Sequence, residues 1–354
     1  MKTKLISGIS VVFVMALFWA CSKNELTNSN ETKLTDLAQT SGQLASGTSF
    51  TIIGSSSSTA NGLVGSGSHG GGRKGGRGGA RILEGTNFIT ADDALLAIVD
   101  AESAGDFRGL RMHEQGGATI THYDTAGNTV TLPEPDPASK PEGCSFSGKQ
   151  FPKNDSLLSK IAKTVIDFAS GVTNKRGDNT ITRSGKIIIN RSGDSSSKTE
   201  IVTYENYKVN GIQIEGTKTR VSTLSGGIGN SSTNVTNGKI TFADGSVATW
   251  ESSKKRVSNI TVDANGKPVS GKITTEGVSS VKLSDGSILF SNSITSPVTE
   301  DVSCGRGRHS PVSGTVTTVY KTDTVVIDFG DGSCSNTTVT VTINGVVSTK
   351  TIGR

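Results

Sequence analysis

Aromatic and apolar side chains are scarce in this sequence. Of its 354 residues, 5% are aromatic and 32% are hydrophobic, a share below that of typical globular domains. A large three-layer core needs more apolar surface than such a chain supplies, which disfavours that architecture. Glycine is abundant instead, with 44 residues. The composition favours a thin β-sheet structure accompanied by disordered segments.

Histidine and cysteine are also rare, with four of each, which limits metal and nucleophile chemistry. His113 and His122 lie close in sequence, but no cysteine or carboxylate motif completes a zinc site, so we interpret both as surface histidines. His309 lies in a basic, glycine-rich stretch without a Gly-x-Ser-x-Gly turn, which disfavours Ser-His-Asp catalysis. We therefore expect no cofactor and no catalytic residues.

The net charge of +5 is modest, and much of it comes from the first residues and from the glycine-rich tract 65–81. This tract resembles the RGG-type arms that bind anions, but it lacks aromatic residues for base stacking. We interpret it as a solvated linker near anionic head groups or surface polysaccharide. A specific nucleic-acid partner is not expected.

The N-terminus has the pattern of an export signal. Lys2 and Lys4 precede the apolar run Leu5–Trp19, which is too short to span a bilayer and ends at Ala20-Cys21. This pattern resembles a bacterial lipoprotein signal, which implies that Cys21 is lipidated and becomes the N-terminus of a membrane-anchored chain. The next residue is Ser22 rather than Asp, so by analogy we expect an outer-membrane protein at the cell surface.

Composition divides the rest of the chain into three parts. Residues 21–81 are rich in Ser, Thr, Asn, Gln and Gly and are predicted to be a disordered tether behind the 1–20 signal. Residues 82–141 are predicted to hold one short helix, capped by Thr90 and ended by Gly105, then a hairpin around residues 126–128 and a proline-rich connector. Residues 142–354 are predicted to be a β domain.

Paired turn residues recur through this β domain between alternating apolar positions. They are Asn210-Gly211, Asn237-Gly238, Asp244-Gly245, Asn265-Gly266, Asp285-Gly286 and Asn344-Gly345. Two-residue hairpins of this type set Val281 opposite Phe290, Leu283 opposite Ile288, and Phe242 opposite Val247. The pattern predicts a mostly β fold, an antiparallel meander of about a dozen strands that forms a curled sheet or a two-layer sandwich.

One motif occurs twice in the β domain. Cys304 precedes Thr324-Val-Val-Ile-Asp-Phe-Gly-Asp-Gly-Ser-Cys334, and Cys144 precedes the weaker copy Thr164-Val-Ile-Asp-Phe-Ala-Ser-Gly171. These strings resemble surface lipoproteins of Bacteroidota that carry paired Asp-Phe-Gly-Asp-Gly-Cys motifs and have no established activity. The resemblance covers residues 144–354 and implies a duplicated β module placed at the cell surface.

The same resemblance implies a disulfide between Cys304 and Cys334, because each family motif has a cysteine one strand upstream. The first copy has lost its second cysteine, which would leave Cys144 free. Pairing of Cys144 with either other cysteine stays open, since sequence does not fix connectivity. Asp328 and Asp331 are weak candidates for calcium ligands, but their spacing does not match an EF-hand, and we interpret them as turn residues.

These features favour a non-enzymatic scaffold protein that is anchored by its lipid and binds a surface polysaccharide or a ligand from the host or environment. Tyr204, Tyr207 and Trp250 are interpreted as core residues rather than a sugar-stacking platform. The alternative is a glycan hydrolase that uses paired carboxylates, drawn from Glu205, Glu215 and Glu251. The oligomeric state stays open.

Overall fold

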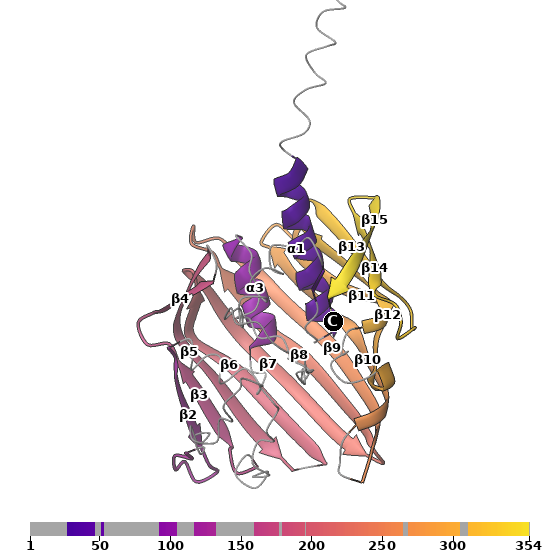
Figure 1. The fold of residues 1–354 in the computed structure, drawn as a ribbon. Coiled ribbons are helices and arrows are strands. Elements are labelled where there is room, and N and C mark those ends of the chain that lie inside the picture. The colour runs from indigo at the N-terminus through magenta and orange to yellow at the C-terminus, as the bar shows by residue number, and fades with distance from the viewer. Residues whose placement is uncertain are drawn as a thin grey trace, which may run out of the picture.

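The computed structural model describes residues 27–46, 51–52, 92–104, 117–131, 159–176, 179–194, 196–264, 268–304 and 311–353. These residues form one antiparallel sheet of 15 strands and two α-helices (Figure 1). The helices are α1 (Thr27–Ser46) and α3 (Asp93–Ser103). A short 3-10 helix, η3 (Val302–Cys304), follows β11.

The strands follow one another along the sheet almost in chain order. Their bounds are β1 Thr51–Ile52, β2 Thr119–Tyr123, β3 Lys163–Asp167, β4 Val172–Arg176, β5 Asn179–Gly193, β6 Ser197–Val209, β7 Ile212–Ser225, β8 Ile228–Thr241, β9 Val247–Val262, β10 Pro268–Leu283, β11 Ile288–Asp301, β12 Pro311–Tyr320, β13 Asp323–Asp331, β14 Thr338–Ile343 and β15 Val346–Gly353. From β5 to β15 each strand pairs with the next, so the predicted antiparallel meander is confirmed.

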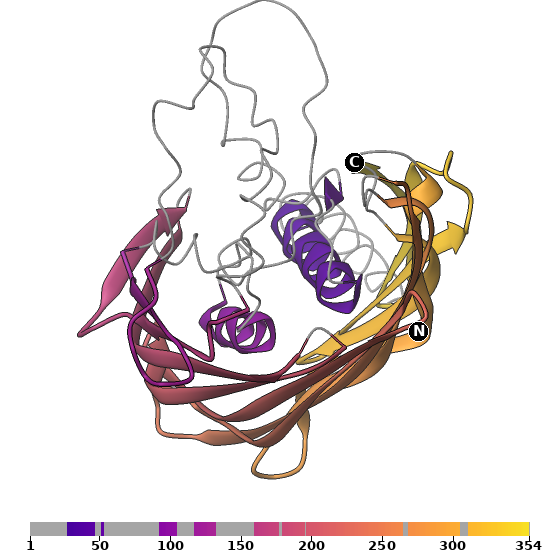
Figure 2. The same cartoon turned by 90° about the horizontal axis from the view of Figure 1, so that it is seen from below.

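Of the two forms expected, the curled single sheet is the one found. Figure 2 shows the strands bent into a trough, with both helices on its concave side. Bulges supply part of this curvature, because an extra residue in one strand bends it and increases its twist. At Gly277 in β10, for example, φ is +138° and a Cβ atom would lie 2.3 Å from the Ser253 carbonyl oxygen. Glycine therefore permits close approach of β9 and β10 at this bend.

The predicted turns are partly right. Asn210-Gly211 and Asn344-Gly345 have the positive φ pairs +48°/+82° and +48°/+85° of two-residue hairpins. Asn237-Gly238 lies inside β8, where Asn237 takes a φ of +53° at a bulge, so the predicted hairpin there is wrong. Asn265-Gly266 lies outside the described residues.

The loops of the two Asp-Gly hairpins are one residue longer than predicted. In the β8–β9 hairpin, Gly245 N–H donates to Phe242 O over 3.0 Å and Phe242 N–H to Ser246 O over 2.9 Å. This longer loop displaces the register by one residue, so Val247 faces Thr241 and not Phe242.

The β10–β11 hairpin shows the same displacement. Val281 does face Phe290 as predicted, but the shift beyond that pair places Ile288 opposite Lys282 rather than Leu283.

Helix α3 lies where the sequence predicted a helix. Its N-cap is Asp92, whose Oδ1 accepts hydrogen bonds from the N–H groups of Ala94 at 3.1 Å and Leu95 at 3.2 Å. A carboxylate at this position also suits the positive end of the helix dipole. The cap predicted at Thr90 is therefore wrong, since α3 begins at Asp93. Gly105, the predicted end, lies outside the described residues.

Helix α1 contradicts the predicted tether, and with it the expectation of a single short helix. Its residues from Thr35 to Ser46 are all buried, and it contacts β10, β11, β12 and β13. The sequence of α1 is polar, so propensity and patterning gave no signal of a packed helix. Tertiary packing in the trough stabilises it instead, as is usual for helices in proteins.

The boundaries predicted at residues 81 and 141 do not separate structural units. β2 comes from the segment 82–141 and pairs with β3, while β1 comes from the expected tether and pairs with β15. The hairpin predicted after β2 is present, because Tyr123 bridges Thr129 across a turn. The 1–20 signal, Cys21, Cys144 and the proline-rich connector lie outside the described residues. Within those that are described, no helix is long and apolar enough to cross a membrane.

The two motif copies form similar strand ends in this one sheet. Ile166 and Phe168 at the end of β3 and Ile327 and Phe329 in β13 are all buried. Asp167 accepts a hydrogen bond from Ala169 N–H at 2.7 Å, as Asp328 does from Gly330 N–H at 2.8 Å. Residue 169 has a φ of +49° and Gly330 one of +99°. The copies thus share a buried strand end and the turn that follows it.

Candidate functional site

The last turn of α3 is held by a buried carboxylate on the concave face. Glu102 Oε1 accepts hydrogen bonds from Trp250 Nε1 at 2.7 Å and Ser279 Oγ at 2.6 Å. Its Oε2 accepts from Lys254 Nζ at 2.7 Å and Ser252 Oγ at 3.1 Å. These four donors come from β9 and β10, more than 140 residues away in the chain. The carboxylate therefore fixes α3 to the centre of the sheet.

Glu102 is ionised in the folded chain. Burial acts to raise the pKa of its carboxyl, but the charge of Lys254 and the hydrogen bonds from Lys254 and Ser279 outweigh burial and hold that pKa at about 2. A carboxylate with this pKa and a full set of donors suits electrostatic docking. A general acid would need a pKa nearer neutrality.

Asp100 is a second buried carboxylate of α3, two residues before Glu102. Arg183 binds Asp100 through two nitrogens, with Nη2 2.6 Å from Oδ1 and Nε 3.3 Å from Oδ2. The Tyr207 hydroxyl donates to the same Oδ2. Burial and the charge of Asp100 hold the pKa of Tyr207 well above its usual value, so its hydroxyl stays protonated as a donor. The pair connects α3 to β5 and β6.

Cations of the sheet bind the carbonyl ends of both helices. Lys218 Nζ donates to Glu102 O and, over 2.9 Å, to Ala104 O at the end of α3. Arg256 Nη1 donates to Ser46 O over 2.7 Å at the end of α1. Within the described helices, neither last turn contains a basic residue of its own. The sheet thus supplies the positive charge that helix C-termini favour.

The amino end of α3 is bound by turns at one rim of the trough. Lys321, in the β12–β13 turn, lies with Nζ 2.7 Å from Asp92 Oδ2. Asn210, in the β6–β7 turn, donates from Nδ2 to Asp93 Oδ1 over 2.6 Å. Two hairpins that are far apart in sequence therefore converge on one helix terminus.

The aromatic residues singled out from the sequence lie in the core, as predicted. Trp250 and Tyr207 have no exposed surface. Tyr204 stacks on Tyr207 with ring centroids 5.8 Å apart, and its hydroxyl donates to Ala101 O over 3.1 Å. These rings pack beneath α3, where they are not available as a sugar-stacking platform.

The three glutamates considered for glycan hydrolysis lie on the opposite, convex face. Glu205, Glu215 and Glu251 each follow a concave-facing aromatic or apolar residue, and side chains alternate between the faces of a strand. They belong to β6, β7 and β9, and Glu215 pairs with Lys239 on β8 at 2.8 Å. The structure does not bring them together across a cleft.

Glu205 does border a shallow, open depression on that face. The depression is also lined by Asp167, Ser184, Lys186 and Lys208. Lys186 lies opposite Glu205 in the β5–β6 register and 3.4 Å from Asp167. Asp167 thus pairs with Lys186 on an exposed surface, and Glu205 lies across the strand pair from that lysine.

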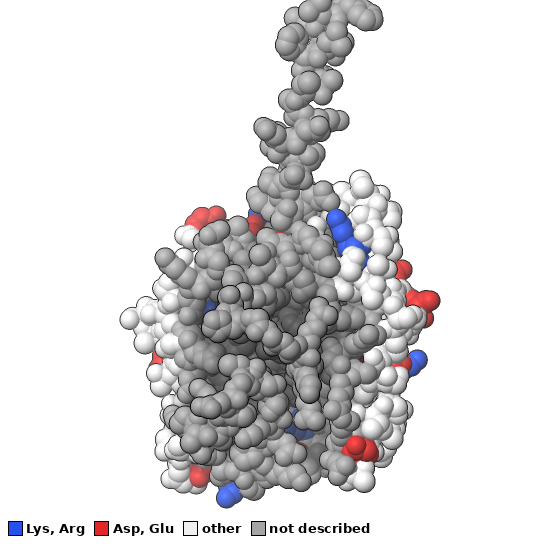
Figure 3. All heavy atoms as spheres, viewed as in Figure 1, with Lys and Arg blue, Asp and Glu red and all other residues white. Residues whose placement is uncertain are grey.

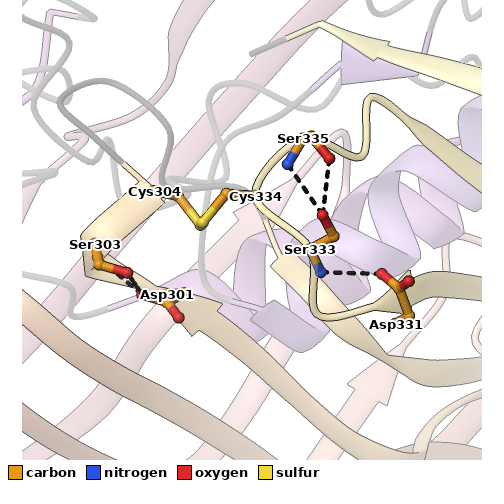
Figure 4. The surroundings of a disulfide bond; sticks show 7 residues. All are labelled: Asp301, Ser303, Cys304, Asp331, Ser333, Cys334 and Ser335. Carbon is orange, nitrogen blue, oxygen red and sulfur yellow. Dashed lines mark hydrogen bonds between the residues drawn. A yellow bond between two sulfur atoms is a disulfide. The ribbon is translucent and has the colours of Figure 1, made fainter.

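The rim opposite the α3 amino end carries the disulfide. Cys304, in η3 after β11, is bonded to Cys334 in the β13–β14 connection, with Cα atoms 5.0 Å apart (Figure 4). This pairing confirms the predicted one. It clamps two neighbouring connections across the intervening β12 and β13.

The acidic residues near the disulfide act as turn residues. Asp331 Oδ1 accepts a hydrogen bond from Ser333 N–H at 3.0 Å, and Asp328 from Gly330 N–H. Among the described residues, no group of three or more His, Cys, Asp or Glu side chains is placed to hold a metal ion. The contacts of Asp328 and Asp331 are those of local turns.

One histidine interpretation is wrong. His122 is buried, and its Nδ1 lies 3.0 Å from Thr164 Oγ1 on β3. Burial and the nearby charge of Arg191 lower its pKa, so the imidazole is neutral at pH 7. It is a core residue of β2 rather than a surface one. His113 and His309 lie outside the described residues.

The docking carboxylates Asp100 and Glu102 were missed by sequence reasoning. One signal was present, because both acids lie in the last turns of an apolar helix, where the helix dipole disfavours negative charge. Acids in that position require cationic partners. Their partners Arg183 and Lys254 lie on strands far along the chain, so the sequence alone did not identify them.

Comparison of the chain with protein-family models, with curated proteins and with solved structures finds no match.

Proposed function

We propose that this chain is a lipid-anchored outer-membrane protein, displayed at the cell surface, that serves as a non-enzymatic binding or structural scaffold. The leader with Ala20-Cys21 supports the anchor. A single acyl chain would give only reversible membrane binding, whereas the several acyl chains that a bacterial lipoprotein carries on its cysteine give a stable anchor.

The main support for a scaffold is that the two buried carboxylates of α3 bind side chains of the sheet. Glu102 receives four donors from the sheet, and Asp100 receives Arg183 and Tyr207. These two buried acids of the concave face are engaged in holding α3. A catalytic acid or base must instead reach a substrate with its proton-accepting atoms.

The convex face supports the binding part of the proposal. Thr203, Thr217 and Thr236 face one another on three adjacent strands, β6, β7 and β8. Hydroxyl groups donate and accept hydrogen bonds, which suits a polysaccharide or another polar ligand. Figure 3 looks onto the opposite, concave side, where the visible charged side chains of the described residues lie scattered along the periphery.

The anchor is tested by metabolic labelling. The full-length chain, expressed in a bacterium that processes lipoproteins, is expected to incorporate an alkyne analogue of palmitate and to partition with membranes. Cys21→Ser should lose both properties. Equal labelling of the two proteins would contradict the proposal, and protease treatment of whole cells then reports whether the β-sheet is outside.

Ligand binding is tested with the soluble chain 22–354 on an array of bacterial and host glycans. This soluble chain retains α1, because α1 packs in the trough. Thr217→Lys is the matched variant, since it leaves the concave face unchanged and blocks the threonine row. Binding that this variant abolishes supports the proposal. Hydrolysis of a bound glycan would contradict its non-enzymatic part.

A further inference from the structure

Helix α1 begins six residues after Cys21. A chain of six residues spans at most about 20 Å when fully extended. The tether expected from the sequence, about sixty residues long, would have let the folded chain move far from the membrane. Because α1 is part of the folded body, the chain between Cys21 and that body is only the few residues before Thr27. The folded body must therefore stay close to the membrane.

The direction of α1 decides which rim lies near Cys21. The Ser41 carbonyl accepts a hydrogen bond from Asn292 on β11. Asn292 lies opposite Ser279 on β10, which in turn lies opposite Ser252 on β9. The Ser46 carbonyl accepts from Arg256, further along β9. The helix therefore runs in the same direction as β9, away from the β8–β9 turn. Its amino end lies at the rim formed by that turn and its neighbours.

We propose that this rim, which we name the turn rim, faces the lipid bilayer and lies against it. It consists of the turns at residues 210–211, 243–245, 284–286, 321–322 and 344–345. Figure 1 shows the amino end of α1 on the same side as the β14–β15 turn. The proposal rests on lipidation of Cys21, which is part of the proposed function.

Apolar side chains on the turn rim fit this placement. The most exposed of them are Val346, with 72% of its surface exposed, and Val347, with 66%. Val247 and Ile288 on the same rim are also exposed. Exposed apolar side chains also occur on the opposite rim, at Leu224 and Val262 among others. Exposed apolar side chains therefore do not show which rim lies near the membrane. The direction of α1 determines it, because α1 begins close to Cys21.

The opposite rim is then directed away from the membrane. Strand β9, with 16 residues, separates the two rims, and its length is about 50 Å at ~3.3 Å per residue. The disulfide, the β7–β8 turn and the end of β9 at Val262 lie on this outer rim. A partner outside the membrane would meet these parts first, together with the convex face.

The test places a tryptophan on each rim of the full, lipidated chain. Val346→Trp reports on the turn rim and Leu224→Trp on the outer rim, and both positions are exposed. Trp250 is buried and common to both variants, so the otherwise unchanged chain gives the baseline. The proteins are reconstituted in phosphatidylcholine vesicles containing dansyl-labelled phosphatidylethanolamine, and energy transfer from tryptophan to dansyl is measured.

We expect transfer from Val346→Trp to be several times that from Leu224→Trp. A flexible Gly/Ser insert of about 30 residues after Lys23, with a root-mean-square span of roughly 30 Å, should reduce the difference. Equal transfer from the two reporters, or stronger transfer from Leu224→Trp, overturns the orientation.

Flotation of the same samples separates this inference from the proposed function. Chains that float with the vesicles but show no difference between the rims refute the orientation alone. Chains that fail to float, like Cys21→Ser, refute the lipid anchor and the orientation with it. Urea unfolding of both tryptophan variants verifies that each is folded.

Discussion

Trp250 donates its indole N–H to Glu102 over 2.7 Å, which joins the first part of β9 to the last turn of α3. The two residues are 148 positions apart in the chain. Because Glu102 also binds Lys254, Ser252 and Ser279, this contact is the centre of a polar network beneath the helix. The network explains how an acidic helix end packs against a sheet with few large apolar residues.

Glu102→Ala tests that network. The change removes the carboxylate that accepts from Lys254 and from the Trp250 N–H in a buried site, so we expect a loss of about 3–5 kcal/mol in the free energy of unfolding. Urea denaturation followed by circular dichroism measures it. Glu251→Ala is the matched control, since Glu251 pairs with Lys282 on the exposed convex face. Its cost should be at most about 1 kcal/mol, and equal costs for the two variants would argue against the network.

Glu300 should give the chain an unusual pH dependence. It is buried beside Arg256 at 2.9 Å. Burial raises the pKa of its carboxyl to about 7 although Arg256 opposes the shift. The folded chain therefore holds this proton more tightly than the unfolded chain, in which the pKa is near 4.5. The contribution of Glu300 to stability is full below pH 4.5 and falls as the pH rises towards 7.

Glu300→Gln should remove this dependence. Relative to the unchanged chain, the variant is expected to gain stability between pH 4.5 and 7, by on the order of 3 kcal/mol. Urea unfolding at several pH values measures the difference. A constant difference across that range would show that Glu300 does not titrate there. Glu102 acts oppositely, because its lowered pKa places its loss of stability on the acid side, between pH 4.5 and about 2.

Removing the disulfide should destabilise the sheet. A bond between residues 30 positions apart restricts the unfolded chain, which corresponds to about 3–4 kcal/mol by loop entropy. The double change Cys304→Ser and Cys334→Ser is compared with the unchanged chain in urea. Cys144→Ser is the control and should keep the disulfide in a non-reduced digest. Linkage of Cys144 to another cysteine in a digest of the unchanged chain would contradict the prediction that it is free.

Leu37→Ala tests whether α1 is part of the folded body. Leu37 is 4% exposed, so its truncation should cost about 2–5 kcal/mol. Leu224→Ala is the control at the tip of a hairpin, where the side chain is 56% exposed and the cost should be within about 0.5 kcal/mol. Similar small effects at both sites would mean that α1 does not pack in the trough.

Gly238→Ala tests the bulge that replaced a predicted hairpin. A Cβ atom there would lie 2.1 Å from the Trp250 carbonyl oxygen, so β8 and β9 would have to separate. The expected cost is about 1–3 kcal/mol, with a lower unfolding temperature. Gly245→Ala, in an open turn with a φ of +83°, separates this clash from backbone strain alone, which costs about 1–2 kcal/mol. A cost for Gly238→Ala below that of Gly245→Ala would rule out the clash.

Some features of the fold follow from local chemistry and were predictable. The Asn-Gly pairs at 210–211 and 344–345 form two-residue turns because both residues accept positive φ. Alternation indicated the strands, and the apolar spacing after Asp92 indicated α3. The register at the Asp-Gly hairpins was predicted incorrectly, since loop length depends on a single extra residue that the pattern does not reveal.

Strands, turns and helix α3 could be predicted from the sequence, because these elements depend on neighbours within a few residues. The place of α1 and the role of Glu102 follow from the tertiary structure instead. The side chains of α1 are mostly polar, and their burial depends on Arg256, Lys254 and Asn292, which lie more than 200 residues further on. Polar groups pack stably when distant partners satisfy their hydrogen bonds and charges, and those partners are defined by the fold rather than by local sequence.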